Sequence, residues 1–286
     1  MLICSEKFLD IVMIDSTYRR NRFNLILVNI LGISNTGKNI MLGFALLSNE
    51  TVESYKYVFK NLKKAWKNRQ PKNFIIDESQ SIQSGELCEF YAEFLGICSI
   101  FKDPRIILCG WHIQKHFLKR FAKVKQKDSK LYNQIISLPF ITCPEKFEDV
   151  VDEIFDSEDV SEKQKDYLEL KLETKKLWAK CYLKFKFAGG VSTTSRIEGL
   201  HAHQKRYMTS NSSLTNLFNS FRKIEEIQVN TLKDELSRHN NNYKDQPLII
   251  LKEIEDVCTE YAFKRILPKF YKGLNYTKKI LRENNW

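Results

Sequence analysis

The pattern of apolar residues in the first fifty positions predicts a β-sheet. Apolar runs cover residues 9–15, 23–33 and 40–47, and short polar loops join them. The run 23–33 is apolar at nearly every position, which is typical of a strand buried on both faces. The loop after it contains Gly37, which favours the positive φ of a tight hairpin. The pattern therefore predicts three strands in an antiparallel meander.

The periodicity changes to a helical one after residue 50. Residues 51–67 place apolar side chains every three or four positions, which predicts an amphipathic helix. A strand over 72–77, a helix over 79–95 and a strand over 105–109 are expected to follow. This order makes the last two strands parallel, because a crossover helix links them. The expected fold class is α/β, with three antiparallel strands, two parallel strands and flanking helices.

The rest of the chain is predicted to be helical. From residue 111 to about 187 apolar residues recur at helical spacing, and Pro139 and Pro144 interrupt the pattern. A loop of small residues at 188–195 precedes three further helices, expected at 196–208, 214–236 and 248–264. We predict four parts: a sheet core over 1–110, an all-helical insertion over 111–187, a core helix over 188–210 and C-terminal helices over 211–286.

Two acidic residues end two of the predicted strands. Asp15 follows the run 10–14, and Asp77 follows the run 71–76 just before a helical pattern begins. If the strand 72–77 pairs in parallel beside the strand 9–15, these carboxylates meet at one sheet edge. Adjacent carboxylates repel each other, and a shared cation would relieve that repulsion. Alternatively, each aspartate caps a helix or initiates a turn.

Composition narrows the class of protein further. The chain has 286 residues, of which 43% are hydrophobic, enough for a sizeable core. No run approaches the roughly 18 apolar residues of a membrane span, so we expect no membrane partner. Seven cysteines stand singly, without a C-x-x-C pair, which indicates free thiols in a reducing compartment and excludes an ordinary zinc finger. The formal net charge of +11 favours a polyanionic partner.

Four segments, taken in order, resemble the transposase domain of Mutator-like elements. Asp15-Ser-Thr-Tyr resembles the opening of that domain, and Ile76-Asp77-Glu-Ser is similar to its second acidic motif. Cys109-Gly-Trp-His112 is similar to its Cys/Asp-x-x-His motif, and Thr193-Thr-Ser-Arg-Ile-Glu198 to the segment bearing its third acid. The set spans residues 9–208. The resemblance implies a ribonuclease-H-like fold with an all-helical insertion before the last catalytic helix.

The resemblance also implies a DDE-type transposase that cuts and joins DNA. Asp15 would bridge a pair of Mg²⁺ or Mn²⁺ ions, with Asp77 holding one ion and Glu198 the other. Cys109 and His112 would support the active site or position DNA. The implied partners are element ends and target DNA in a homo-oligomeric synaptic complex, and the implied location is the nucleus.

Basic residues cluster near these acids and could neutralise DNA phosphates. They are Arg19, Arg20, Arg22, Arg196, Lys205 and Arg206. The same residues could instead belong to solvated surfaces. A separate hypothesis assigns Cys109, His112 and His116 to a zinc site, because their spacing could place three ligands on one turn of a helix.

The sequence departs from the family in two respects. One is Ile76, which replaces the more usual Thr before the second acid, and the other is the set of domains. Members commonly carry an N-terminal zinc-binding DNA-recognition domain and a Cys/His-rich SWIM finger, and this sequence shows neither, which suggests a fragment. The second functional hypothesis is a domesticated, catalytically inactive transposase-derived protein that binds DNA or regulates transcription.

Overall fold

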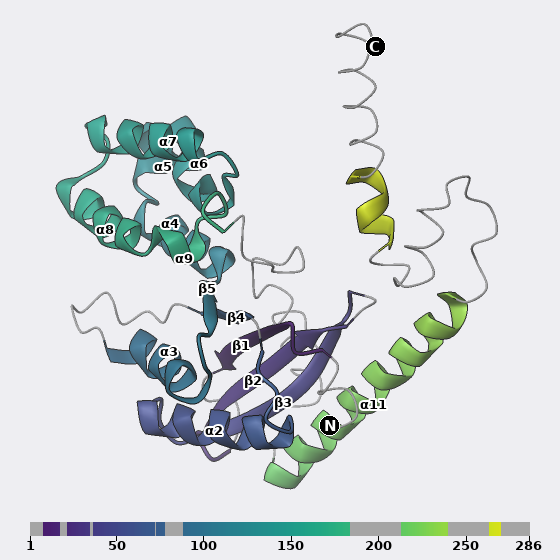
Figure 1. Cartoon of the computed structure of the whole chain (residues 1–286). Coiled ribbons are helices and arrows are strands. Elements are labelled where there is room, and N and C mark those ends of the chain that lie inside the picture. Colours follow the sequence, from purple (N-terminus) through teal and green to yellow (C-terminus); the bar gives the residue numbers. More distant parts are fainter. Residues whose placement is uncertain are drawn as a thin grey trace, which may run out of the picture.

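The computed structural model describes most of the sheet core and the helices that follow it. The described residues are 8–17, 22–34, 37–71, 73–77, 88–183, 213–239 and 263–269. A five-stranded sheet forms the centre, in the order β3-β2-β1-β4-β5 (Figure 1). Its strands are β1 (Ile11–Thr17), β2 (Ile26–Ile33), β3 (Asn39–Leu47), β4 (Asn73–Ile76) and β5 (Arg105–Leu108).

The strand pairing confirms the predicted mixed sheet. β1 pairs antiparallel with β2, and β2 antiparallel with β3, whereas β4 runs parallel to both β1 and β5. Gly37 in the β2–β3 hairpin has a φ of 77°, which favours glycine there. Met13 lies opposite Ile75 in the β1–β4 register. Continued two residues further, this register sets Asp15 opposite Asp77. The architecture is compatible with a ribonuclease-H-like fold.

Two helices cover one face of the sheet. α2 (Val52–Ala65) begins after Thr51, whose hydroxyl oxygen accepts a hydrogen bond from the Ser54 backbone N–H at 3.3 Å. α3 (Cys88–Ile100) packs closely on α2, because a Cβ added to Gly96 would lie 2.8 Å from Tyr55 Cβ. The described part of α3 extends past the predicted end at Leu95, since buried Ile97 continues its apolar face. Residues 78–87, the start of the predicted helix, lie outside the described residues.

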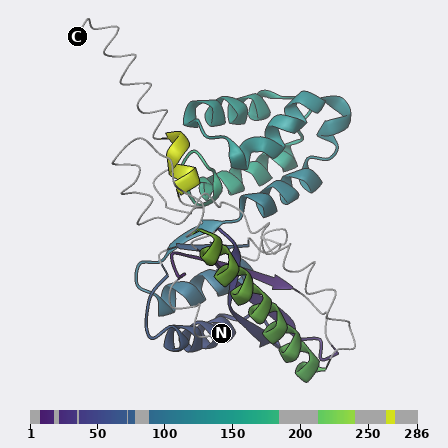
Figure 2. The same cartoon turned by 90° about the vertical axis from the view of Figure 1, so that its right-hand side faces the viewer.

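The opposite face of the sheet packs against α11 (Leu214–His239), as the two views show (Figures 1 and 2). Phe221 stacks on Phe44 of β3 with ring centroids 4.0 Å apart. Gln228 Oε1 accepts a hydrogen bond from the Met41 backbone N–H at 2.9 Å. Because β3 is an edge strand, this bond occupies a backbone donor that could otherwise pair with another strand. α11 thus covers both a face and part of an edge.

Residues 110–183 form helices and contain no strand, in agreement with their helical spacing. The helices are α4 (Gly110–Arg120), α5 (Val124–Lys127), α6 (Ser129–Ser137), the 3-10 helix η2 (Leu138–Phe140), α7 (Pro144–Asp156), α8 (Glu162–Glu173) and α9 (Lys175–Trp178). Trp178 lies at their centre, 5.9 Å from the Phe117 ring and 5.8 Å from the Phe147 ring.

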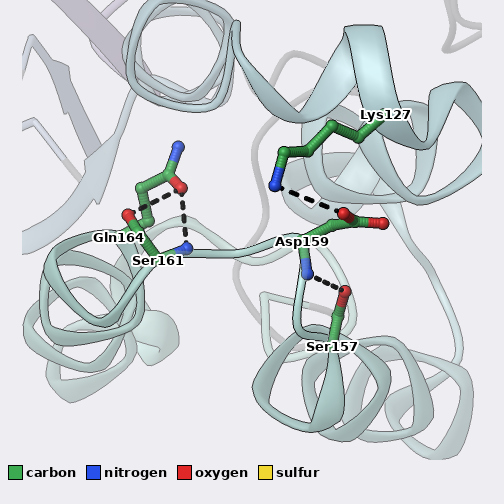
Figure 3. A network of polar contacts seen from close by, with 5 residues as sticks. All are labelled: Lys127, Ser157, Asp159, Ser161 and Gln164. Carbon is green, nitrogen blue, oxygen red and sulfur yellow. Dashed lines mark hydrogen bonds and ion pairs between the residues drawn. The ribbon is translucent and has the colours of Figure 1, made fainter.

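Polar contacts fix the loop between α7 and α8 (Figure 3). Lys127 Nζ lies 3.4 Å from Asp159 Oδ1, and the Asp159 backbone N–H donates to Ser157 Oγ at 3.2 Å. The Ser161 backbone N–H donates to Gln164 Oε1 at 3.0 Å, and Gln164 Nε2 donates to the Arg120 carbonyl at 2.8 Å. These bonds attach the start of α8 to the end of α4.

Several sequence predictions extend beyond the described residues. The helix 196–208 lies outside them, so the proposed position of the helical block before that helix stays a prediction, as do the four domain boundaries. Of the predicted helix 248–264, only residues 263 and 264 are described. Residues 263–269 are helical, and the rest of the predicted helix 248–264 lies outside the described residues.

We predict that α11 is held to the sheet mainly by its buried aromatic residue. Phe221 is 2% exposed, whereas Phe218 on the same helix is 53% exposed. Phe221→Ala should therefore lower the free energy of unfolding by about 3–5 kcal/mol, because it removes a buried ring and leaves a cavity. Phe218→Ala is the matched control and should cost much less. Urea denaturation of both variants measures the difference, and equal losses would contradict this packing.

Candidate metal centre

Three elements bring ionisable side chains to the C-terminal edge of the parallel strands. Asp15 lies near the end of β1, and Asp77 directly follows β4. His112 is in the first turn of α4, which begins directly after β5 and Cys109. The Cys109 backbone N–H donates to the Ile76 carbonyl at 2.9 Å, so the end of β5 is fixed beside the residue that precedes Asp77. Open α/β sheets commonly place their sites at this edge.

The three side chains converge within a small volume. One ligand atom from each of Asp15, Asp77 and His112 lies within 4.8 Å of the other two. His112 Nδ1 is 2.8 Å from Asp77 Oδ1. Asp15 is 5% exposed, whereas the side chains of Asp77 and His112 are 32% and 14% exposed. The cluster is thus buried on the β1 side and open to solvent at Asp77.

The electrostatics of His112 follow from its two neighbours. Burial alone lowers the pKa of His112, but hydrogen bonding to Asp77 and Cys109 and the charge of Asp77 outweigh it and raise this pKa to about 10. The imidazole is therefore protonated at neutral pH and forms an ion pair with Asp77. This pair orients the carboxylate of Asp77, so His112 is a positioning residue for it.

A second group of polar residues lies beside the cluster, towards the helices. Ser16, which follows Asp15, contacts the Tyr55 hydroxyl at 3.2 Å, and Tyr55 donates to Glu50 Oε1 at 2.9 Å. Burial, followed by the charges of Glu93 and Glu50, raises the pKa of Tyr55, so its hydroxyl stays protonated. This network ties the end of β1 to α2.

Glu93 on α3 was not among the site residues predicted from the sequence. Glu93 is 9% exposed. Burial raises the pKa of its carboxyl, and the charges of Asp77 and Asp15 raise this pKa further. A signal was available in the sequence, because Glu93 stands four residues before the apolar Ile97 in a helical pattern. A charged residue at an apolar position of a helix indicates a buried site.

The structure describes only some of the residues that the sequence predicts for the site. Asp15, Asp77 and His112 come together, and Cys109 is buried directly beside them. Arg22 is exposed, and its guanidinium carbon lies 5.3 Å from the centre of the Phe23 ring. The other predicted site residues lie outside the described residues: Glu198, Arg19, Arg20, Arg196, Lys205 and Arg206.

The zinc alternative receives no support from the described residues. The group of His, Cys, Asp and Glu side chains whose ligand atoms converge there consists of Asp15, Asp77 and His112. The set Cys109, His112 and His116 does not form such a group in that part of the chain.

The residues fit a divalent cation with hard ligands. Asp15 and Asp77 offer carboxylate oxygens, the ligands that Mg²⁺ and Mn²⁺ prefer. A buried carboxylate next to a second carboxylate is costly without a nearby positive charge. His112 supplies one positive charge to Asp77, and a cation between the two carboxylates would supply more. The fold and this cluster define an α/β protein with a candidate divalent-cation centre at a sheet edge.

Comparison with known families identifies a domain in this part of the chain. Residues 11–116 match the MULE transposase domain family, which confirms the resemblance to Mutator-like transposases. The matched segment includes Asp15, Asp77, Cys109 and His112. The chain thus carries a transposase-derived domain.

Relatives of this chain occur among plant proteins from Arabidopsis thaliana. Protein FAR1-RELATED SEQUENCE 5 is 22% identical over 269 residues, which cover 93% of this chain and 32% of that protein. Protein FAR1-RELATED SEQUENCE 7 is 21% identical over 256 residues, covering 89% and 31%. Protein FAR-RED IMPAIRED RESPONSE 1 is 22% identical over 207 residues, covering 70% and 23%. The chain therefore spans about a third or less of the length of these relatives.

Among the described helices, none combines the length and the apolar character needed to cross a bilayer.

We predict that Mn²⁺ or Mg²⁺ raises the melting temperature of the protein through Asp15 and Asp77. An ion that binds only the folded state stabilises it by an amount that grows with the logarithm of its concentration relative to Kd. Asp15→Asn and Asp77→Asn should each remove most of that response in a thermal-melting titration. Asp166→Asn, an exposed substitution on α8, is the control and should respond like the wild type. An equal response from Asp77→Asn and the wild type would contradict the site.

Proposed function

We propose that this chain contains the catalytic domain of a DDE-type transposase with a ribonuclease-H-like fold. Its reaction would be metal-dependent cleavage and transfer of DNA strands. The observation that carries the proposal is the convergence of Asp15, Asp77 and His112 at the sheet edge. The match over residues 11–116 to the MULE transposase domain supports the same chemistry.

The proposed roles follow the positions of the side chains. Asp15 and Asp77 would hold the divalent ions, and Glu198, assigned from the resemblance, would complete the acidic triad. Bound ions of this kind activate the attacking oxygen and stabilise the leaving oxygen in phosphoryl transfer. His112 holds the Asp77 carboxylate through their 2.8 Å contact. Cys109 supports the site from its buried position at the start of α4.

The substrate is proposed to be DNA, in particular element ends and target DNA. A net charge of +11 suits a polyanion, although the metal centre itself is acidic. Basic residues near the acids in sequence, including the exposed Arg22, would neutralise phosphates around the centre. A synaptic complex would bring copies of the chain together in the nucleus.

The catalytic proposal predicts a shared loss of activity. Asp15→Asn, Asp77→Asn and Glu198→Gln should each abolish Mg²⁺-dependent nicking of DNA, and combining them should cause no further loss, because the acids act as a unit. The assay uses the chain joined to the recognition domains that family members carry, with Asp166→Asn as the control. Activity that survives Glu198→Gln would show that the third acid is misassigned.

A second candidate function is a domesticated, non-catalytic DNA-binding protein or transcription regulator. The names of the three relatives favour it, because one refers to an impaired far-red response and none of the three mentions transposition. Under this hypothesis the fold and the DNA surface are kept, whereas nicking is absent. DNA binding would then be unaffected by Asp77→Asn.

Both candidates predict DNA binding by phosphate contacts. We expect the isolated chain to bind duplex DNA with a Kd of roughly 10⁻⁴–10⁻⁶ M at physiological salt, without regard to sequence. Affinity should fall steeply as salt rises, and replacing Arg19, Arg20 and Arg22 with Ala should flatten that dependence. Fluorescence anisotropy with a terminal-repeat duplex and a scrambled duplex, across a series of salt concentrations, measures the Kd for each duplex and its dependence on salt. A preference for the terminal repeat of about a hundredfold or more would place sequence recognition within this chain.

A further inference from the structure

Glu93 is a buried acid without an evident structural role. It is 9% exposed, and its Oε1 atom has no hydrogen-bond partner among the described residues. Burying a carboxyl without a partner is costly, and burying a charged one is more so. The surrounding helices are otherwise packed with apolar side chains. The burial of this carboxyl therefore calls for an explanation.

The position of Glu93 on α3 places it on the side of that helix that meets α2. α3 crosses α2 where Gly96 approaches Tyr55, with a Cβ built on Gly96 lying 2.8 Å from Tyr55 Cβ. Glu93 precedes Gly96 by three residues and shares its side of the helix. The Tyr55 hydroxyl contacts Ser16 Oγ at 3.2 Å, and Ser16 is adjacent to Asp15. Glu93 thus lies on the side of the helix layer that faces the end of β1.

The charges around Glu93 are negative. Burial raises the pKa of Glu93 well above its usual value, and the carboxylates of Asp77, Asp15 and Glu50 raise it further. Together with Glu93 they form a cluster of acidic groups next to the edge of the sheet. Such a cluster is tolerated if Glu93 is neutral, or if a cation compensates the negative charge. If Glu93 is neutral, a neutral replacement should leave cation affinity unchanged. If a cation compensates its charge, the replacement should weaken cation affinity.

We propose that Glu93 is a further acidic residue of the cation site, and that its carboxylate helps to hold the ion of Asp15 and Asp77 from the helix layer. The inference rests on the proposed function, since it requires an ion at Asp15 and Asp77. Mg²⁺ and Mn²⁺ commonly retain waters when bound to proteins, so a carboxylate that is not a direct ligand can act through a water. Residues in this outer position orient the direct ligands and tune affinity for the metal.

The experiment compares Mn²⁺ binding by the full chain and its variants, measured by thermal melting during a Mn²⁺ titration. Glu93→Gln keeps the size of the side chain and resembles the neutral acid. Glu93→Met also lacks the carboxylate, suits the apolar surroundings and serves if the Gln variant does not fold. Both should weaken apparent Mn²⁺ affinity by about 10–100-fold while leaving a folded protein. Glu169→Gln, exposed on α8, should bind Mn²⁺ like the wild type.

The outcomes separate this inference from the proposed function. If the wild type responds to Mn²⁺ and the Glu93 variants respond equally, Glu93 is a neutral core residue and the inference is overturned, while the cation site stands. If the wild type shows no response, the cation site and the role of Glu93 are both overturned. A weaker response confined to the Glu93 variants supports the inference. If the melting temperature of a Glu93 variant differs from that of the wild type by the same amount with and without Mn²⁺, the role of Glu93 is purely structural and the inference is overturned.

Discussion

The repulsion between Asp15 and Asp77 is the constraint around which this structure is arranged. Parallel pairing of β1 with β4 sets these carboxylates side by side, with Asp15 almost completely buried. Two negative charges with oxygen atoms within 4.8 Å of each other raise the free energy of the folded state unless a positive charge lies nearby. His112 supplies one such charge through its contact with Asp77. The remaining negative charge makes the edge suited to a divalent cation.

The rest of the fold supplies the stability that such an edge requires. Alternating residues of β1 and β4 pack in opposite directions, against α2 and α3 on one face and against α11 on the other. A sheet buried on both faces moves little, so the side chains at its edge keep their relative positions. α4 starts directly after β5, which brings His112 to the same edge without an intervening loop.

The two functional hypotheses share this framework and differ in its use. A transposase needs the cation centre for chemistry, whereas a DNA-binding regulator needs only the fold and a basic surface. The family match covers the residues of the centre, and relatives such as FAR1-RELATED SEQUENCE 5 are similar over 93% of the chain. Under the first hypothesis, the acidic centre would serve metal chemistry, and the net charge of +11 would serve a phosphate-rich partner.

Apolar periodicity alone was enough to order the strands and helices of the sheet core, because it changes visibly from a strand pattern to a helical one. It also indicated Asp15 and Asp77, since an acid that ends a buried strand stands out against its apolar neighbours. Other features emerge only from the packed fold: Gln228 covers the edge of β3, and His112 pairs with Asp77. These features depend on contacts between residues far apart in the chain, and no local pattern encodes which residues meet across two packed layers.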